Sequence, residues 1–157
     1  MFGDTLTLLS PERTLFVQEL ESKKRVFDTL ATLLAHRQTQ LSHNQIFDYL
    51  IEREKLGTTT LGAGIALPRA RAPINQPYAA LLLLNEGIMI DSPDKQPVSV
   101  FMALMLPEVS SERYSEMIIK IVASFAARSV AEELAETSEP EIAVNYMESL
   151  FQQNKEV

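Results

Sequence analysis

The sequence predicts an α/β sandwich, and three observations support this fold class. Apolar residues recur at helical spacing in the first third of the chain and again in the last third. Between these regions lie two uninterrupted apolar runs bounded by turn residues, which are typical of strands buried on both faces. No linker long enough to separate domains interrupts the 157 residues, of which 46% are hydrophobic. We therefore expect a single domain over residues 1–157.

The first predicted elements are a strand and a helix. An apolar stretch at 14–20 follows Pro11 and indicates an opening strand or an extended segment. Ser22 is placed to cap a helix over 23–36. The apolar face of this helix, with steps of three and four residues, consists of Val26, Phe27, Leu30, Leu33 and Leu34.

A second helix follows, and both of its ends carry a signal. Ser42 and Gln45 have the spacing of a capping box, which predicts the start of the helix. Its buried side chains are expected to be Ile46, Phe47, Leu50 and Ile51. We expect this helix to end at Gly57.

The middle of the chain is expected to hold the sheet. Three glycines and three prolines between 57 and 77 favour loops and short strands there. The apolar runs at 78–84 and 98–106 predict strands at the centre of the sheet.

The last third predicts three helices. The first begins at Ser110 or Ser111, ends near Arg128, and carries Ile118, Ile119, Ile121, Val122 and Phe125. Shorter helical patterns occupy 130–135 and 139–151. Ser138 and Glu141 have the capping-box spacing that would open the last of these helices.

Charge and composition exclude several functions. The net charge of −7 opposes binding to nucleic acid and to anionic membrane surfaces. The N-terminus lacks the order of a secretory signal, and no apolar run is long enough for membrane insertion. The absence of cysteine rules out disulfides and thiolate metal sites and is compatible with a cytoplasmic location. Because His36 and His43 lack metal-ligand spacing and no phosphate-cradling Gly-Lys loop is present, we expect neither metal nor cofactor.

Several stretches match one family pattern in order and with compatible spacing. The stretch REKLGTTTLGAGIALPR at 53–69 resembles the pattern R-E-x-L-G-S-T-x-x-G-x-G-I-A-I-P-H of the enzyme IIA domains of the bacterial phosphotransferase system, in the fructose, mannitol and nitrogen-regulatory class. Four shorter stretches also resemble motifs of this family, namely SKKR at 22–25, IMID at 88–91, DKQPV at 94–98 and LMLP at 104–107. The resemblance implies a mixed β-sheet flanked by helices, and the length of the chain favours the nitrogen-regulatory branch.

The same resemblance implies a phosphorylation site whose histidines are replaced. The family accepts a phosphoryl group on the His that ends the long pattern, beside a loop Arg and a second His. The loop Arg corresponds to Arg53, but Arg69 stands at the first His position and Tyr114 at the second. A guanidinium stays protonated and has no free lone pair, so it cannot replace a nucleophilic imidazole. We therefore expect no catalytic residue and no ordinary phosphoryl transfer at position 69.

The residues around position 69 can be interpreted in two ways. Arg69 is either a fixed positive charge that binds a partner carboxylate or an anion, or a product of neutral drift. Arg53, with the nearby hydroxyl of Thr60, is either part of an anion site or a cation at a helix end. Arg71 would extend a positive patch, so a partner surface would include Arg69, Arg71 and Tyr114.

Three functions are consistent with these residues. The first is a regulatory protein that acts by protein contact, for which the resemblance implies potassium-transport components or sensor kinases as partners. The second is an active phosphocarrier that exchanges with a phosphocarrier protein and uses another acceptor, such as His36, His43 or Thr60. The third is a small-anion sensor in which Arg53 and Arg69 hold the ligand.

Overall fold

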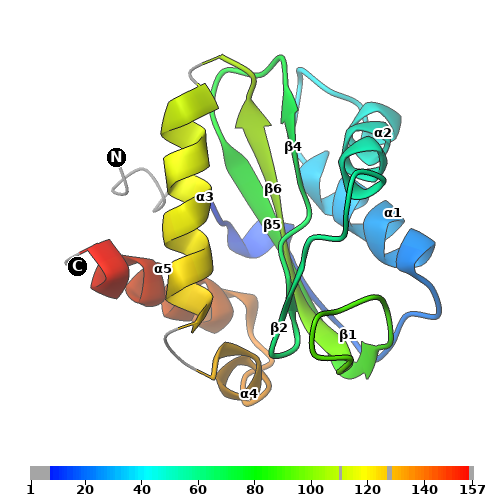
Figure 1. Cartoon of the computed structure of the whole chain (residues 1–157), viewed down its shortest axis with the longest axis vertical. Helices are drawn as coiled ribbons and strands as arrows, with labels where there is room; N and C mark the ends of the chain where they lie inside the picture. Colours follow the sequence, from blue (N-terminus) through cyan, green and yellow to red (C-terminus); the bar gives the residue numbers. More distant parts are fainter. Residues whose placement is uncertain (1–7, 110, 127–128, 156–157) are drawn as a thin grey trace.

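A computed structural model of the chain, which describes residues 8–109, 111–126 and 129–155, shows a sheet between two helical layers (Figure 1). Helices α3 and α5 cover one face of the sheet, and α1 and α2 cover the other. The helices are α1 (Lys23–Leu34), α2 (His43–Glu54), α3 (Ser111–Ala126), α4 (Val130–Leu134) and α5 (Pro140–Lys155). The strands are β1 (Thr14–Val17), β2 (Thr60–Gly62), β3 (Ile65–Ala66), β4 (Arg69–Ala72), β5 (Tyr78–Ile88) and β6 (Val98–Pro107). The predicted α/β class and the mixed sheet are both confirmed.

The sheet is mixed, and its two long strands lie at the centre as predicted. Strand β5 pairs antiparallel with β6 and parallel with β1. On its other side β6 pairs parallel with β3 near its start and with β4 near its end, while β2 pairs antiparallel with β3. In the described sheet β4 pairs only with β6, so one side of β4 is an edge of the sheet.

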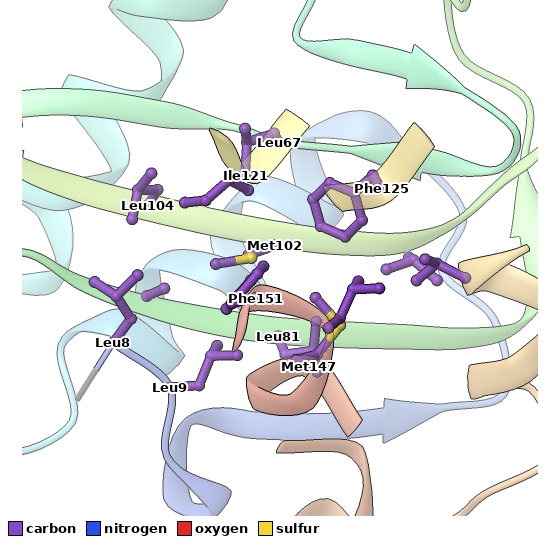
Figure 2. Close-up of a cluster of buried hydrophobic side chains, with 14 of the residues drawn as sticks. Leu8, Leu9, Leu67, Leu81, Met102, Leu104, Ile121, Phe125, Met147 and Phe151 are labelled. Atoms are coloured by element: carbon purple, nitrogen blue, oxygen red, sulfur yellow. The ribbon is translucent and has the colours of Figure 1, made fainter. Parts of the chain in front are cut away.

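Side-chain alternation along the central strands divides the core in two. Figure 2 shows Leu81 of β5 and Met102 of β6 packed near Met147 and Phe151 of α5 on one face. Their immediate neighbours in the sequence point to the opposite face, where they pack with α1 and α2. The buried residues on that face include Phe27, Leu30, Ile46, Leu50, Leu82, Phe101 and Met105. Both faces of the two strands are therefore buried, which explains their unbroken apolar sequence.

The helix starts predicted for α1 and α2 are confirmed. The Ser22 hydroxyl accepts a hydrogen bond from the Arg25 backbone N–H at 3.1 Å. At α2 the capping box is complete, because Ser42 Oγ accepts from the Gln45 N–H (3.2 Å) and Gln45 Oε1 accepts from the Ser42 N–H (2.8 Å). Each cap satisfies a backbone N–H that lacks an intrahelical partner.

Three predicted element ends are wrong. Strand β1 ends at Val17, and α1 ends at Leu34. Helix α2 ends at Glu54 and not at Gly57, because the Leu56 and Gly57 N–H groups already make three-residue turns to earlier carbonyls.

The predicted capping box at Ser138 is also wrong. Helix α5 begins at Pro140, a residue suited to the first helical turn, and the Glu139 carbonyl accepts from the Ile142 and Ala143 N–H groups (both 3.1 Å). Ser138 therefore lies outside the cap. For α3, a start at Ser111 agrees with the structure, whereas Ser110 and Arg128 lie outside the described residues.

Candidate functional site

The segment that follows α2 places two arginines on one face of β4. A tight turn at 62–64 joins β2 to β3; Gly62 has φ 89° and Gly64 φ 81°, values that favour glycine. Asp94 Oδ2 accepts from the Ala63 N–H at 2.8 Å and holds this turn. Along β4, Ala70 and Ala72 point into the core under α1 and α2, so Arg69 and Arg71 point to the other face.

These arginines line a cavity of about 700 Å³ between α2 and α3, at the edge of the sheet. Arg53, near the end of α2, lines the same cavity. The remaining lining residues are Tyr49, Glu52, Leu56, Ala70, Leu106, Ser115, Ile118 and Ile119. The structure thus brings together Arg53, Arg69 and Arg71, which the sequence analysis had proposed as a positive patch.

Each guanidinium is held by a neutral group of the protein. Arg53 Nη1 donates to the Gly57 carbonyl (2.9 Å), and Arg69 Nη1 donates to the Leu67 carbonyl (3.2 Å). Arg71 Nη2 donates to Ser115 Oγ on α3 (2.9 Å), but its Nη1 is buried and has no hydrogen-bond partner. Among the residues that the structure describes, no carboxylate lies within ion-pair distance of any of the three.

The three positive charges act on one another. Burial lowers the pKa of Arg69, the charge of Arg53 lowers it further, Glu54 opposes this change, and Arg71 adds to the lowering. The guanidinium nevertheless remains protonated at neutral pH. The cavity therefore concentrates positive charge for which the described residues supply no directly bonded anion.

Glu54, a residue of the 53–69 motif, is structurally important in this region. Its side chain is 7% exposed and accepts from Lys23 Nζ (2.8 Å), Thr59 Oγ1 (2.8 Å) and the Thr59 N–H (3.3 Å). Burial alone would raise the pKa of Glu54, but the hydrogen bonds from Lys23 and Thr59 outweigh it, and the pKa falls below its ordinary value. Glu54 thus ties the end of α2 to the start of α1 and to the loop that leads to β2.

Thr60 and Tyr114 do not reach the cavity. Thr60 is 7% exposed, and its hydroxyl donates to the Asp91 carbonyl at 2.8 Å. Tyr114 is 5% exposed because it shares the buried face of α3 with Met117 and Ile121, three and seven residues on. Neither residue lines the cavity. Thr60 is therefore not part of the expected anion site, and Tyr114 is not part of the expected partner surface.

One cavity residue lies on α3 but away from the core. Ile119, one of the apolar residues of the predicted helix, is 67% exposed and lines the cavity. Leu56, just after α2, is 84% exposed on the other side. Position on the helix could have identified Ile119, since it lies off the face defined by Tyr114, Met117 and Ile121.

The histidines do not line the cavity either. His43 Nε2 lies 2.9 Å from Asp28 Oδ1, and its Nδ1 lies 3.0 Å from Asn44 Oδ1. His36 Nε2 lies 3.7 Å from a Glu12 carboxylate oxygen. Within the described ranges, no cluster of three histidine or carboxylate side chains is arranged to hold a metal ion, and no helix is long and apolar enough to cross a membrane.

Comparison with known proteins finds a matching family model and similar proteins. A family model described as "Phosphoenolpyruvate-dependent sugar phosphotransferase system, EIIA 2" matches residues 7–150. A nitrogen regulatory protein of Pseudomonas aeruginosa is 34% identical over 128 residues, which cover 81% of this chain and 83% of that protein. A nitrogen regulatory protein homolog of Haemophilus influenzae is 32% identical over 131 residues, with 81% and 80% covered.

Solved structures show the same fold. The nitrogen regulatory protein IIA-Ntr of Neisseria meningitidis has a TM-score of 0.82 and 33% identity, and the match covers 89% of this chain and 96% of that chain. The IIA mannitol protein of Escherichia coli has a TM-score of 0.71 and 17% identity, with 88% and 97% covered. At that identity the second match supports the fold alone.

Proposed function

This chain belongs to the EIIA 2 family of the phosphoenolpyruvate-dependent sugar phosphotransferase system, and we propose that it is a regulatory member that acts by protein contact without accepting a phosphoryl group at position 69. Its relatives include nitrogen regulatory proteins, and the likeness to IIA-Ntr covers most of both chains. A cytoplasmic location is part of the proposal. So are potassium-transport components or sensor kinases as partners, the two classes that the family resemblance implies.

The observation that carries the proposal is the chemistry of Arg69 in its cavity. We match Arg69 to the phospho-accepting His of the family, on the order and spacing of the 53–69 motif. A phosphocarrier needs a nucleophile with an available lone pair, which a protonated guanidinium lacks. Tyr114, which we match to the second His, is buried, and a phenol with a pKa near ~10 is a poor acid or base at neutral pH.

The remaining features of the cavity support binding. Arg53 and Arg71 lie beside Arg69, and Leu56 and Ile119 expose apolar surface at the same place. Arginine and apolar side chains are the residue types that carry much of the energy in protein interfaces. A surface of this kind can hold a partner although no group is transferred.

Phosphoryl transfer tests the proposal directly. The purified chain is incubated with phosphoenolpyruvate, enzyme I and the cognate phosphocarrier, and its intact mass is measured by mass spectrometry. We expect no change in mass, while the phosphocarrier in the same tube gains about 80 Da, the mass of one phosphoryl group, as a positive control. A gain of about 80 Da on this chain would refute the proposal.

The alternative of an active phosphocarrier makes a different prediction. A phosphoryl group on another acceptor would survive Arg69→Ala and disappear in His36→Gln, His43→Gln or Thr60→Val. The contacts of His43 with Asp28 and Asn44, and the burial of Thr60, do not favour these acceptors. The same mass measurement on the variants decides between the two functions.

A second candidate, a small-anion sensor, is favoured by one specific contact. The buried Nη1 of Arg71 lacks a partner, and the planar arginine fork suits an oxyanion. Isothermal titration calorimetry with inorganic phosphate and phosphoenolpyruvate would show heat that is reduced in Arg53→Gln and Arg69→Gln. The absence of heat above background would exclude this candidate for those ligands.

A further inference from the structure

We propose that the cavity lined by Arg53, Arg69 and Arg71 binds one carboxylate of a partner polypeptide whose flanking side chains are apolar. This inference rests on the proposed function, since it names the kind of partner that the contact surface fits. It concerns the described residues of α2, β4 and α3 that line the cavity.

The cavity carries concentrated positive charge. Three guanidiniums share the cavity, and in the described part of the chain none makes an ion pair. Arg71 contributes a buried N–H group without an acceptor, and unpaired buried donors are costly. A carboxylate entering the cavity would offset the repulsion among the three cations.

Negative groups near the cavity limit its positive charge. Glu52 lines the cavity, and Glu54 lies close enough to Arg69 to act on its pKa. Both weaken the attraction of the three arginines for any anion. The C-terminal end of α2 adds partial negative charge beside Arg53.

The size and apolar lining of the cavity favour a polypeptide over a small anion. A single carboxylate fills only a small part of about 700 Å³, and Leu106 and Ile118 supply apolar wall for the rest. Leu56 and Ile119, which also line the cavity, are 84% and 67% exposed. Apolar side chains on either side of an acidic residue would cover both of them, which an inorganic ion cannot do.

The charge of the whole chain adds specificity. Its net charge of −7 repels an acidic segment overall, whereas the arginine cavity attracts one. An acidic partner is therefore directed to this position. The apolar contacts then fix the position of the bound segment in the cavity.

The test is a titration of the complete 15N-labelled chain by NMR with defined peptides. The probe is the capped tripeptide acetyl-Leu-Glu-Leu-amide, and its matched control is acetyl-Leu-Gln-Leu-amide, which has nearly the same shape without the charge. Acetyl-Gly-Glu-Gly-amide tests the apolar flanks, and inorganic phosphate tests a small anion. We expect shifts around Arg53, Arg69 and Arg71, with affinity for the Glu probe about tenfold above that for either control peptide.

Variants connect the preference to the cavity. Arg71→Gln should abolish the preference for the Glu peptide over the Gln peptide. The matched control Arg25→Gln, at an exposed arginine on α1, should leave it unchanged. The 15N spectrum of each variant reports whether the fold is intact.

Three outcomes would overturn the inference: equal affinity for the Glu and Gln peptides, shifts confined to another surface, or phosphate binding as strong as the Glu peptide. The last outcome would assign the cavity to a small anion. An unchanged mass in the phosphotransfer assay with no peptide preference refutes only this inference. A gain in mass refutes the proposed function, whatever the peptides do.

Discussion

At the scale of single residues, two ionic groups beside each other behave in opposite ways. Arg69 is a cation that shares its cavity with two others and makes no ion pair among the described residues. Glu54 is a nearly buried anion whose partners, Lys23 and Thr59, satisfy it with three contacts. A group that is satisfied within the fold stabilises it, whereas one that is not is available to a ligand.

The first stability prediction concerns Glu54→Gln. The change removes the negative charge bound by Lys23 and should lower the free energy of unfolding at pH 7 by about 1.5–3 kcal/mol, the range for hydrogen bonds to charged groups. The pKa of Glu54 is lowered in the folded state, so its contribution is present above the ordinary value of 4.5 and is lost as the pH falls through the folded-state pKa. The difference between wild type and variant should therefore shrink as the pH falls below 4.5.

Urea unfolding at a series of pH values measures this difference. Glu21→Gln is the control, because Glu21 is 85% exposed and makes only a 3.8 Å pair with Arg25. The control should leave the stability nearly unchanged at every pH. A constant difference for Glu54→Gln between pH 7 and pH 3 would contradict the assigned role.

At the scale of elements, the cap of α2 determines where the helix that carries Arg53 begins. Ser42→Ala removes the hydroxyl that accepts from the Gln45 N–H and should cost about 1 kcal/mol of stability. Ser42→Asp preserves an acceptor at the same position and should retain most of the stability. Thermal unfolding followed by circular dichroism compares the variants, and an equal loss in Ala and Asp would show that the cap does not stabilise α2.

Element packing also explains why β4 can present arginines on one side. Ala70 and Ala72 occupy the face under α1 and α2, where short side chains allow close packing. Arg69 and Arg71 alternate with them and reach the gap between α2 and α3. An edge strand with this alternation supplies both core and binding surface.

At the scale of the whole molecule, two cores share the same two strands. Adjacent residues of β6, Phe101 and Met102, are both fully buried, but Phe101 packs with α1 and α2 while Met102 packs with α3 and α5. Because loss of either core disturbs β5 and β6, we expect the described domain to unfold cooperatively.

Phe101→Ala and Met102→Ala test this cooperativity. They should destabilise the protein by about 3–5 and 2–5 kcal/mol respectively, the usual cost of such cavities. Circular dichroism and tyrosine fluorescence should each report one urea transition with the same midpoint, because tyrosines pack at both cores: Tyr49 and Tyr78 at one, Tyr114 and Tyr146 at the other. The exposed control Leu56→Ala should stay within about 0.5 kcal/mol of wild type. Two steps in either signal would show that the cores unfold independently.

The sequence predicted much of the fold, because the relevant signals are local. The cap at Ser42 and Gln45 depends on residues three positions apart, and the buried runs at 78–84 and 98–106 depend on composition over a few residues. Element ends were less predictable, as at Gly57 and Ser138, because the competing turns there depend on individual hydrogen bonds. The family resemblance directed attention to position 69, and Arg69 lines a cavity in the structure.

By itself, the sequence determined that residue 69 is an arginine and that the motifs around it follow the order of the EIIA 2 family. Only the tertiary structure decided which residues meet there. It brought Arg53 and Ile119 to the cavity and buried Thr60 and Tyr114, although all four had been considered from their positions in the sequence. The physical reason is the distance along the chain over which each property is set. Side-chain chemistry is a property of one residue, and periodicity is a property of a few neighbouring residues. A cavity is formed by packing among elements from different parts of the chain.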